Sequence, residues 1–321
     1  MSNTTQDAPE TRPAPAPSSK AVRRPGDLVF SGLSIGSAAL ILTILAGVAI
    51  FLIINALPVF EADPEDISGG NGFFSYVWPL AAGTVVVSLI AMVLATPVAV
   101  GIALYVSHYA PKRLGVTIGF VIDLLAAVPS VVYGLWGYMV FAPQMRPFYE
   151  WLSENMGWLP LFGGNPSTTG RTLLTAGIVL AVMILPIITS VSREVFLQTP
   201  RLHEEAALAL GATKWEMIRT AVLPFGKPGI IGGTMLGLGR ALGETMAVAM
   251  ILSVGPFTWS LISSGNRTIP GEIALNFPEA QGGLRMHELI AAGLVLFVIT
   301  LAVNLVARWI VQRSAEFSGA N

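Results

Sequence analysis

The sequence predicts an all-α polytopic membrane protein with six transmembrane helices, and three observations carry this prediction. Of the 321 residues, 53% are hydrophobic and 12% are charged, whereas soluble domains carry about 25% charged residues. The mean hydropathy of +0.69 is that of a chain whose main solvent is lipid. Six apolar runs also reach the roughly 20 residues that a helix needs to cross a bilayer. The expected spans are 28–57, 79–107, 114–142, 172–192, 229–254 and 289–311.

Composition excludes several classes of function. The chain has 18 Lys and Arg residues against 19 Asp and Glu residues, and a net charge of −1 offers no basic surface for nucleic acid. It contains no cysteine, which excludes disulfides, thiolate metal sites and cysteine nucleophiles. His108, His203 and His287 are widely separated and form no metal-binding motif. We therefore expect no metal, no cofactor and no nucleic-acid partner.

The distribution of cations predicts the orientation in the membrane, because Lys and Arg in short loops stay on the cytoplasmic side. Residues 1–27 are rich in Pro, Ala, Ser and Thr, which predicts a disordered tail. Thirteen cations lie in this tail, in the second and fourth loops and at the C-terminal end, and four lie in the other loops. We therefore expect both termini, including residues 314–321, in the cytoplasm.

Prolines interrupt three of the expected spans, at Pro97, Pro129 and Pro186. A proline removes a backbone hydrogen bond and kinks a helix, so neighbouring helices or waters must satisfy the freed carbonyl. The kinks have two interpretations, packing geometry or a hinge for transport.

The fourth loop, residues 193–227, is expected to fold as a helix-turn-helix on the cytoplasmic face. Thr199-Pro200 supplies an N-cap and a first-turn proline, and Gly211 can end the first helix in the left-handed conformation. Thr213 and Glu216 have the spacing of a capping box, which would start the second helix. Such a pair could dock a soluble partner, or it could lie on the membrane surface as an amphipathic helix.

Specific residues of this loop resemble the EAA loop of ABC-importer permeases. The match consists of Glu205-Ala206-Ala207, then Gly211 four residues on, and Leu223-Pro224, where we expect the second helix to stop. Ala221 departs from the isoleucine that is common in the family. The resemblance implies the type I ABC importer permease fold, and it implies that these residues couple the chain to a separate cytoplasmic ATPase.

A second motif, in the fifth expected span, makes the resemblance specific to one family of importer permeases. Residues 232–248 resemble the PstC family of phosphate-importer permeases, and Met246-Ala247-Val248 distinguishes them from the sister PstA family, which usually continues Ala-Pro-Leu. Residues 128–134 are similar to the same family. The resemblance implies a non-enzymatic subunit of an ATP-driven phosphate importer in the bacterial inner membrane. Its implied partners are a PstA-like sister permease, two PstB-like ATPases and a PstS-like phosphate-binding protein outside the cell.

Two charges in the fifth span are the first candidates for the substrate pathway. Arg240 falls near the middle of the hydrocarbon slab, and Glu244 follows at i+4, within reach for an ion pair. The pair could simply hold two helices together, or the guanidinium could bind the anion while Glu244 holds or releases it. Thr245 completes this candidate set. Asp123, in the third span, could bond nearby hydroxyl groups or contact the pathway.

Glycines at four-residue spacing surround the charged pair and predict close helix packing. They form two ridges, Gly229, Gly233 and Gly237 in one and Gly239 and Gly243 in the other. Their spacing does not fit a dinucleotide-binding loop, and we expect a tight seam against the sister permease.

Competing functions lack their sequence requirements. No phosphate-binding Gly-x-x-x-x-Gly-Lys-[Ser/Thr] motif occurs, so a partner chain must hydrolyse ATP. An intramembrane hydrolase would need a nucleophile and a base at membrane depth, and none of the three histidines lies inside an expected span. A passive channel would have no use for a docking loop. Another oxyanion, or the role of the sister subunit, remains as an alternative.

Overall fold

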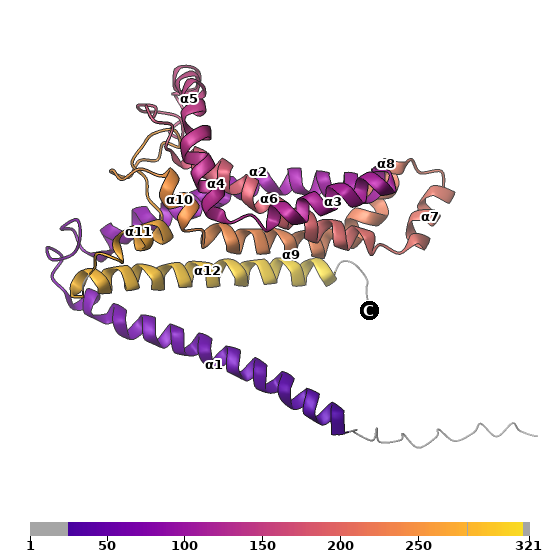
Figure 1. Ribbon diagram of the computed structural model, residues 1–321, viewed down its shortest axis with the longest axis horizontal. Helices are drawn as coiled ribbons and strands as arrows, with labels where there is room; N and C mark the ends of the chain where they lie inside the picture. Colours follow the sequence, from indigo (N-terminus) through magenta and orange to yellow (C-terminus); the bar gives the residue numbers. More distant parts are fainter. Residues whose placement is uncertain (1–24, 281, 317–321) are drawn as a thin grey trace, which may run out of the picture. The chain divides into compact units, whose positions relative to one another are not determined.

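The computed structural model describes residues 25–280 and 282–316, and these residues form helices and loops without a β-strand (Figure 1). The chain divides into two compact units, residues 1–50 and 51–321, which are treated separately. The expected tail, residues 1–27, and the expected C-terminal segment, residues 314–321, lie almost wholly outside the described residues. Within the first unit, the described residues belong to α1 (Pro25–Glu61). This part of α1 exposes apolar side chains all along its length, including Leu33, Leu40 and Leu45, which is the pattern of a helix that faces lipid.

The second unit contains the end of α1 and all the remaining helices. In chain order these are α2 (Phe73–Leu104), the π-helical η1 (Tyr105–Tyr109), α3 (Lys112–Ala126), α4 (Ser130–Trp136), the π-helical η2 (Gly137–Phe141), α5 (Ala142–Met156), α6 (Leu173–Leu197), α7 (Arg201–Ala209), α8 (Lys214–Met217), the π-helical η3 (Ile218–Val222), α9 (Leu223–Leu242), α10 (Met246–Ile251), α11 (Ile269–Asn276) and α12 (Leu284–Glu316).

The prediction of an all-α membrane protein is confirmed, but the count of six spans is not. In the described part of the chain, four helical segments are long and apolar enough to cross a membrane. They are Val29–Glu61, Phe73–Tyr109, Leu173–Leu197 and Leu284–Ile310. A fifth is reached only if the bent pair Lys112–Ala126 and Ser130–Met156 makes one span.

The expected third span, residues 114–142, is not one straight helix. The chain bends by 88° between α3 and the helical segment that begins with α4. The bend falls at Val128-Pro129, where the proline is extended, with ψ 139°, and precedes the first residue of α4. The residue before a proline is disfavoured in the helical conformation, so the break occurs where the sequence places its proline. In contrast, Pro97 and Pro186 lie inside the continuous helices α2 and α6.

The expected fifth span, residues 229–254, is broken as well. α9 ends at Leu242, and Gly243, Glu244 and Thr245 separate it from the short α10. Arg171, from the loop before α6, caps the C-terminus of α10. Its guanidinium donates to the carbonyl oxygens of Ile251 and Leu252 at 3.1 and 2.6 Å. A cation at the C-terminus of a helix satisfies its free carbonyls and opposes the helix dipole.

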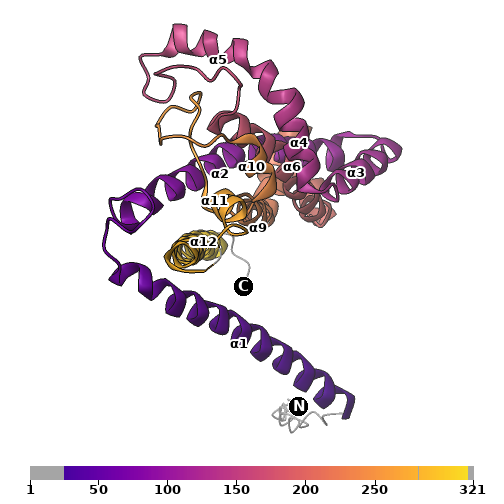
Figure 2. The same cartoon turned by 60° about the vertical axis from the view of Figure 1, so that its left-hand side comes forward.

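The core of the second unit is built around α6, which packs against both α2 and α9. Small residues on α2, among them Ala91, Ala95 and Ala99, are almost fully buried against Leu180 and Ile184 of α6. Figure 2, in which α12 is seen almost end on, shows α9 and α11 beside α12, and both pairs are in contact. The small side chains let the helix axes approach closely, which supplies packing where lipid offers no hydrophobic driving force.

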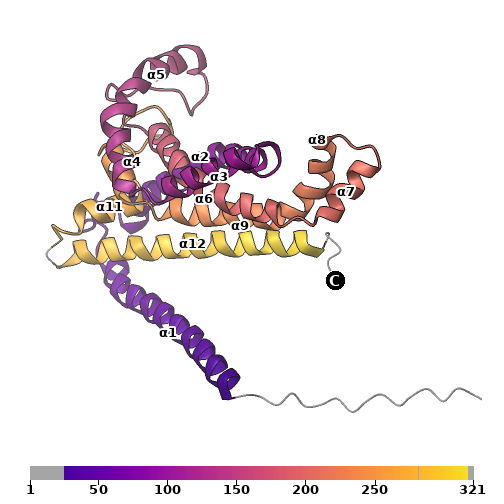
Figure 3. The same cartoon turned by 45° about the vertical axis from the view of Figure 1, so that its right-hand side comes forward.

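The two ends of the second unit are formed by different segments. η1, the start of α3, α7 and α8 lie at one end, called the α7 end (Figures 1 and 3). The loop 62–72, the start of α2, α11 and the start of α12 lie at the other, called the α11 end (Figures 1 and 3). α9 runs between them, so residues near its middle lie between the two ends.

Candidate functional site

Arg240 lies on α9 at the edge of an apolar hollow of about 740 Å³. The other residues that line the hollow are Ile187, Gly232, Met235, Leu236, Gly239 and Asn304. The Arg240 side chain is half-buried, and within the described part of the chain its buried Nε has no hydrogen-bond partner. A guanidinium has five donors in a planar fork. Arg240 therefore presents donors of fixed geometry next to an otherwise mostly apolar space.

The sequence places Arg240 and Glu244 within reach of an ion pair, but the structure does not pair them. Among the described residues no ion pair joins them, because the helix ends at Leu242 and the i,i+4 relation on one helix face is lost. Glu244 is instead buried at 8% exposure, and its Oε1 accepts a hydrogen bond from the backbone N–H of Ala247 at 3.1 Å. Glu244 thus satisfies the first turn of α10, and among the described residues no acid forms an ion pair with Arg240.

Thr245 and Asp123, the other two candidates, have separate surroundings. The hydroxyl of Thr245 donates to the carbonyl oxygen of Gly243 at 3.1 Å, within the break between α9 and α10. Asp123 on α3 accepts a hydrogen bond from Ser190 at 2.9 Å and pairs with Arg193 at 3.5 Å, both on α6. Asp123 therefore ties α3 to α6, and no contact brings it to Arg240 within the described residues.

The first glycine ridge packs against α6 of the same chain. A Cβ on Gly229 would lie 2.3 Å from Cγ2 of Val195, and a Cβ on Gly237 would lie 2.9 Å from Cγ1 of Ile188. Gly233 faces Val191 in the same row, at 3.1 Å from its Cβ. Gly239 and Gly243 take no part in this seam, because nothing lies within 4 Å of a Cβ on Gly239 and only backbone oxygens lie near one on Gly243.

The turn between α7 and α8 has the local structure that the sequence predicts. Gly211 has φ +86°, and Thr213 and Glu216 form a complete capping box. The Thr213 backbone N–H donates to the Glu216 carboxylate at 2.7 Å, and the Thr213 hydroxyl donates to it at 2.8 Å. These hydrogen bonds hold the pKa of Glu216 below its ordinary value.

Two details of this loop differ from the expected helix-turn-helix, which is not confirmed. Thr199 does not cap α7, because Pro200 occupies the N-cap position and the buried Thr199 hydroxyl has no hydrogen-bond partner in the described part of the chain. Leu223-Pro224 does not stop the second helix, because η3 leads directly into α9. A π-helical turn is wider than an α-helical one, which accommodates the proline ring and its missing N–H.

The α7 end exposes large apolar side chains. Leu202 is 76% exposed and Leu210 is 90% exposed, and Leu208 and Trp215 are also exposed. The expected coupling residues Glu205 and Ala206 are exposed on the same helix, while Ala207 is half-buried. An exposed apolar group rimmed by charge is typical of a surface that binds another protein.

Side chains of η1, which follows α2, contact α7 and α8, and the sequence did not predict these contacts. Nε2 of His108 lies 3.4 Å from Oε1 of Glu204 on α7, and Nδ1 of His108 lies 2.7 Å from the Ser107 hydroxyl. The Lys214 ammonium on α8 lies over the Tyr109 ring, 4.7 Å from its centre. Both π-helical η1 residues, His108 and Tyr109, therefore contact the two short helices, and η1 fits the tendency of π-helical turns to occur at functional sites.

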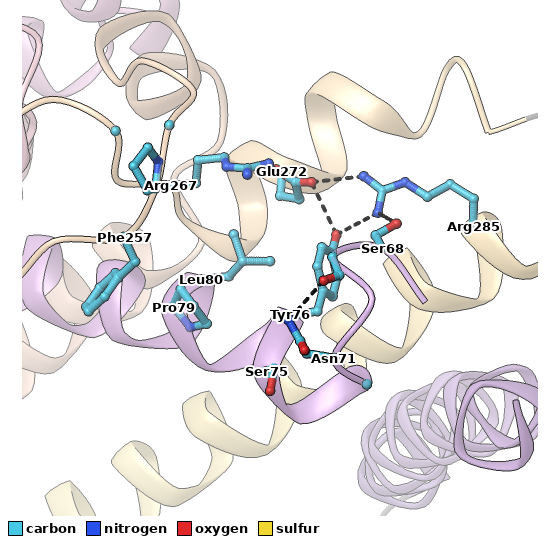
Figure 4. A pocket seen from close by; sticks show the side chains of 15 residues that line it. Ser68, Asn71, Ser75, Tyr76, Pro79, Leu80, Phe257, Arg267, Glu272 and Arg285 are labelled. Carbon is cyan, nitrogen blue, oxygen red and sulfur yellow. Dashed lines mark hydrogen bonds and ion pairs between the residues drawn. The ribbon is translucent and has the colours of Figure 1, made fainter. Parts of the chain in front are cut away.

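An ion-pair cluster at the α11 end is the second feature that sequence reasoning missed (Figure 4). Glu272 of α11, 1% exposed, pairs with Arg267 at 2.9 Å and with Arg285 at 3.0 Å. Arg285 also pairs with the buried Glu288 at 2.8 Å, and Tyr76 donates to Glu272 at 3.2 Å. The i,i+3 spacing of Arg285 and Glu288 was the one signal available in the sequence.

Comparison with known proteins places the chain in a family. Residues 95–316 match the family described as binding-protein-dependent transport system inner membrane component. The chain is 46% identical over 312 residues to the phosphate transport system permease protein PstC 2 of Mycobacterium tuberculosis, covering 94% of this chain and 96% of the relative. It is 38% identical over 304 residues to the phosphate transport system permease protein PstC of Mesorhizobium japonicum, covering 92% of each chain.

A solved structure shares the fold. A chain in the crystal structure of a bacterial alginate ABC transporter superimposes with a TM-score of 0.58, at 16% identity, covering 90% of this chain and 95% of that chain. The fold is therefore that of a type I ABC importer permease, as the EAA-loop resemblance implied.

Proposed function

The chain belongs to the family of binding-protein-dependent inner membrane transport components and, within it, to the PstC permeases, and we propose that it brings inorganic phosphate into the bacterial cell. It is a membrane-spanning permease subunit and not an enzyme, because ATP is hydrolysed by a separate subunit in this family. An ATPase and a binding protein are therefore its partners in general terms. The specific assembly that we propose contains a PstA-like sister permease, two PstB-like ATPases and a PstS-like phosphate-binding protein.

The observation that carries the coupling role is the exposed apolar surface of α7 and α8. Leu202, Leu210 and Trp215 are more than half exposed beside Glu205. His108 and Tyr109 of η1 contact α7 and α8 and hold this surface on the second unit. A movement of α7 would therefore displace η1 and the end of α2. We propose that the surface docks into the ATPase, with Glu205, Ala206, Ala207 and Gly211 on the docking element and Leu223 and Pro224 at the start of the helix that leads to Arg240.

The orientation follows from the same assignment. Lys112, Arg113, Arg201 and Lys214 lie on the segments of the α7 end, whereas Arg267 and Arg285 at the α11 end are paired with acids. Lys and Arg in short loops are enriched on the cytoplasmic side. We propose that the α7 end faces the cytoplasm, together with both termini, and that the α11 end faces the binding protein.

Arg240 is our candidate for the substrate pathway. A fixed cation lowers the cost of moving an anion through a low-dielectric slab, and its planar fork can donate two parallel hydrogen bonds to a tetrahedral oxyanion. Since Glu244 bonds to Ala247 and not to Arg240, the guanidinium donors remain available. Glu244 and Thr245 act indirectly in this proposal, by shaping the break that positions the end of α9.

Charge reversal at Glu205 tests the proposed function. Glu205→Arg should lower ATP-dependent phosphate uptake by about tenfold or more, which is the effect of about 1.4 kcal/mol of docking free energy. Glu154→Arg is the matched control, because Glu154 is also exposed but lies on α5, away from the docking element. Uptake by reconstituted complex should fall only for Glu205→Arg, and unchanged uptake with that variant would contradict the coupling role.

A further inference from the structure

A cavity of about 270 Å³ opens beside the ion-pair cluster at the α11 end (Figure 4). Three parts of the second unit line it, namely the glycine-rich loop before α2 with the start of that helix, the loop 255–267, and the residues of the ion-pair cluster. The polar side chains in its lining are Ser68, Asn71, Ser75, Tyr76, Arg267, Glu272 and Arg285. None of these residues lines the hollow at Arg240, so the two spaces are separate.

The lining carries more positive than negative charge. Arg267 and Arg285 contribute two cations and Glu272 contributes one anion, while Glu288 pairs with Arg285 without lining the cavity. Arg285 donates through Nη1 to Ser68, Tyr76 and Glu288 and through Nη2 to Glu272. Arg267 bonds to Glu272 through Nη1 alone, and its side chain is 36% exposed. Within the described residues, Nε and Nη2 of Arg267 therefore remain as unused donors at the cavity.

The loop before α2 and the start of α2 also contribute to the lining. Gly69, Gly70 and Gly72 have positive φ, which turns the loop tightly against the start of α2. The α2 N-cap, Gly72, has no side chain to satisfy the first N–H groups of the helix. The Ser75 hydroxyl lies on this first turn and lines the cavity. The cavity thus combines a guanidinium edge, a hydroxyl and the positive end of a 32-residue helix.

We propose that this cavity binds a tetrahedral oxyanion, held between the free edge of Arg267 and the first turn of α2. Packing alone explains the two ion pairs of Glu272, but it does not explain a cavity next to unused guanidinium donors. The choice of phosphate as the oxyanion rests on the proposed function, whereas the cavity and its chemistry do not. The cavity lies at the α11 end, which we assign to the outside, so phosphate would bind there before it reaches Arg240.

Equilibrium binding of radiolabelled phosphate to the assembled transporter, without ATP and without the binding protein, tests the proposal. Nanodiscs of zwitterionic lipid remove competition from anionic headgroups. Arg267→Gln should weaken phosphate binding about tenfold or more, because it removes the charge-assisted hydrogen bonds that the guanidinium donates to the anion. Arg146→Gln is the matched control, because Arg146 is an exposed arginine on α5. Equal binding by Arg267→Gln and wild type would overturn the proposal.

Two further variants keep the result interpretable if Arg267→Gln assembles poorly. Ser75→Glu places a negative charge at the cavity without touching an ion pair and should abolish binding, while Ser75→Gln, of similar size but neutral, should retain most of it. Arg240→Gln should leave this binding intact. Binding lost in Arg240→Gln and kept in Ser75→Glu would overturn the proposal, because it would place the only phosphate site in the pathway.

The source of the oxyanion is settled by changing the lipid and the ion. If anionic phosphatidylglycerol lowers phosphate binding equally in the wild type and in Arg146→Gln, a lipid headgroup competes for the same site. That result still supports an oxyanion site. If the transporter takes up sulfate and not phosphate, the proposed function fails while sulfate binding that depends on Arg267 preserves the cavity assignment. Failure of the function and failure of the site are therefore distinguishable.

Discussion

The two ends of the second unit differ in what they bury: the α11 end buries charged side chains, whereas the α7 end exposes apolar ones. At the α11 end, Glu272 and Glu288 are buried and paired with arginines. At the α7 end, Leu202 and Leu210 are exposed beside the exposed Glu205. A buried charge needs its partner within the chain, whereas a group of exposed apolar side chains marks a surface for another protein or for a membrane. The α11 end is therefore held together internally, and we propose that another protein covers the α7 end.

Removal of the Glu272 carboxylate should have the largest effect on stability, because this carboxylate forms two of the ion pairs that hold the α11 end together. Glu272→Ala leaves Arg267 and Arg285 without their shared partner and should destabilise this end by about 3 kcal/mol, at the lower limit for a broken buried pair because both arginines are partly exposed. Thermal unfolding of the purified protein in detergent measures the loss. Glu279→Ala, at an exposed acid just after α11, should change stability little, and equal effects of the two variants would contradict the structural role of the cluster.

Loss of the contact between His108 of η1 and Glu204 of α7, called the η1 brace, should change stability less than Glu272→Ala does. It should instead lower the coupling of transport to ATP hydrolysis. His108→Gln removes the contact with Glu204, for which a partly exposed pair contributes up to about 1 kcal/mol. Phosphate transported per ATP hydrolysed should fall by up to about fivefold, with assembly and unfolding temperature nearly unchanged. His203→Gln, on the exposed face of α7, is the control. A parallel loss of stability would mean that the brace only supports the fold.

The smallest expected effect is the pH dependence of the turn before α8. The folded-state pKa of Glu216 is lowered by hydrogen bonds from Thr213. The stabilisation is therefore complete above the unfolded pKa, about 4.3, and is lost as the pH falls through the lower folded value. Hydrogen exchange at the start of α8 should rise relative to its intrinsic rate below about pH 4. Glu216→Gln should remove this dependence, and an unchanged profile in that variant would assign the effect to another group.

Local signals were the ones that the sequence predicted well. The capping box at Thr213 and Glu216 and the left-handed Gly211 depend on residues within a few positions of one another, and both are confirmed. The EAA-loop residues likewise predicted the family correctly. Such features can be found without knowledge of the rest of the fold, because their hydrogen bonds close within one turn.

Predictions failed where a helix was assumed to be continuous or to end at a proline. The Arg240–Glu244 pair depended on a helix that in fact ends at Leu242, and the stop at Pro224 ignored the π-helical turn before it. The α11 cluster joins Tyr76 to Glu272 across 196 positions. No periodicity reports such a contact, because it depends on how the helices pack and not on local spacing.

Phosphate uptake into proteoliposomes is the most direct test of ATP-driven phosphate transport through a pathway that contains Arg240. The vesicles would contain this chain with its sister permease and ATPases, with the binding protein outside and ATP inside, and they would be compared with vesicles that contain Arg240→Gln. We expect the wild type to accumulate phosphate only when ATP is present, and we expect Arg240→Gln to assemble normally but to lose uptake. Phosphate uptake by Arg240→Gln at the wild-type rate, or wild-type uptake without ATP, would contradict this expectation.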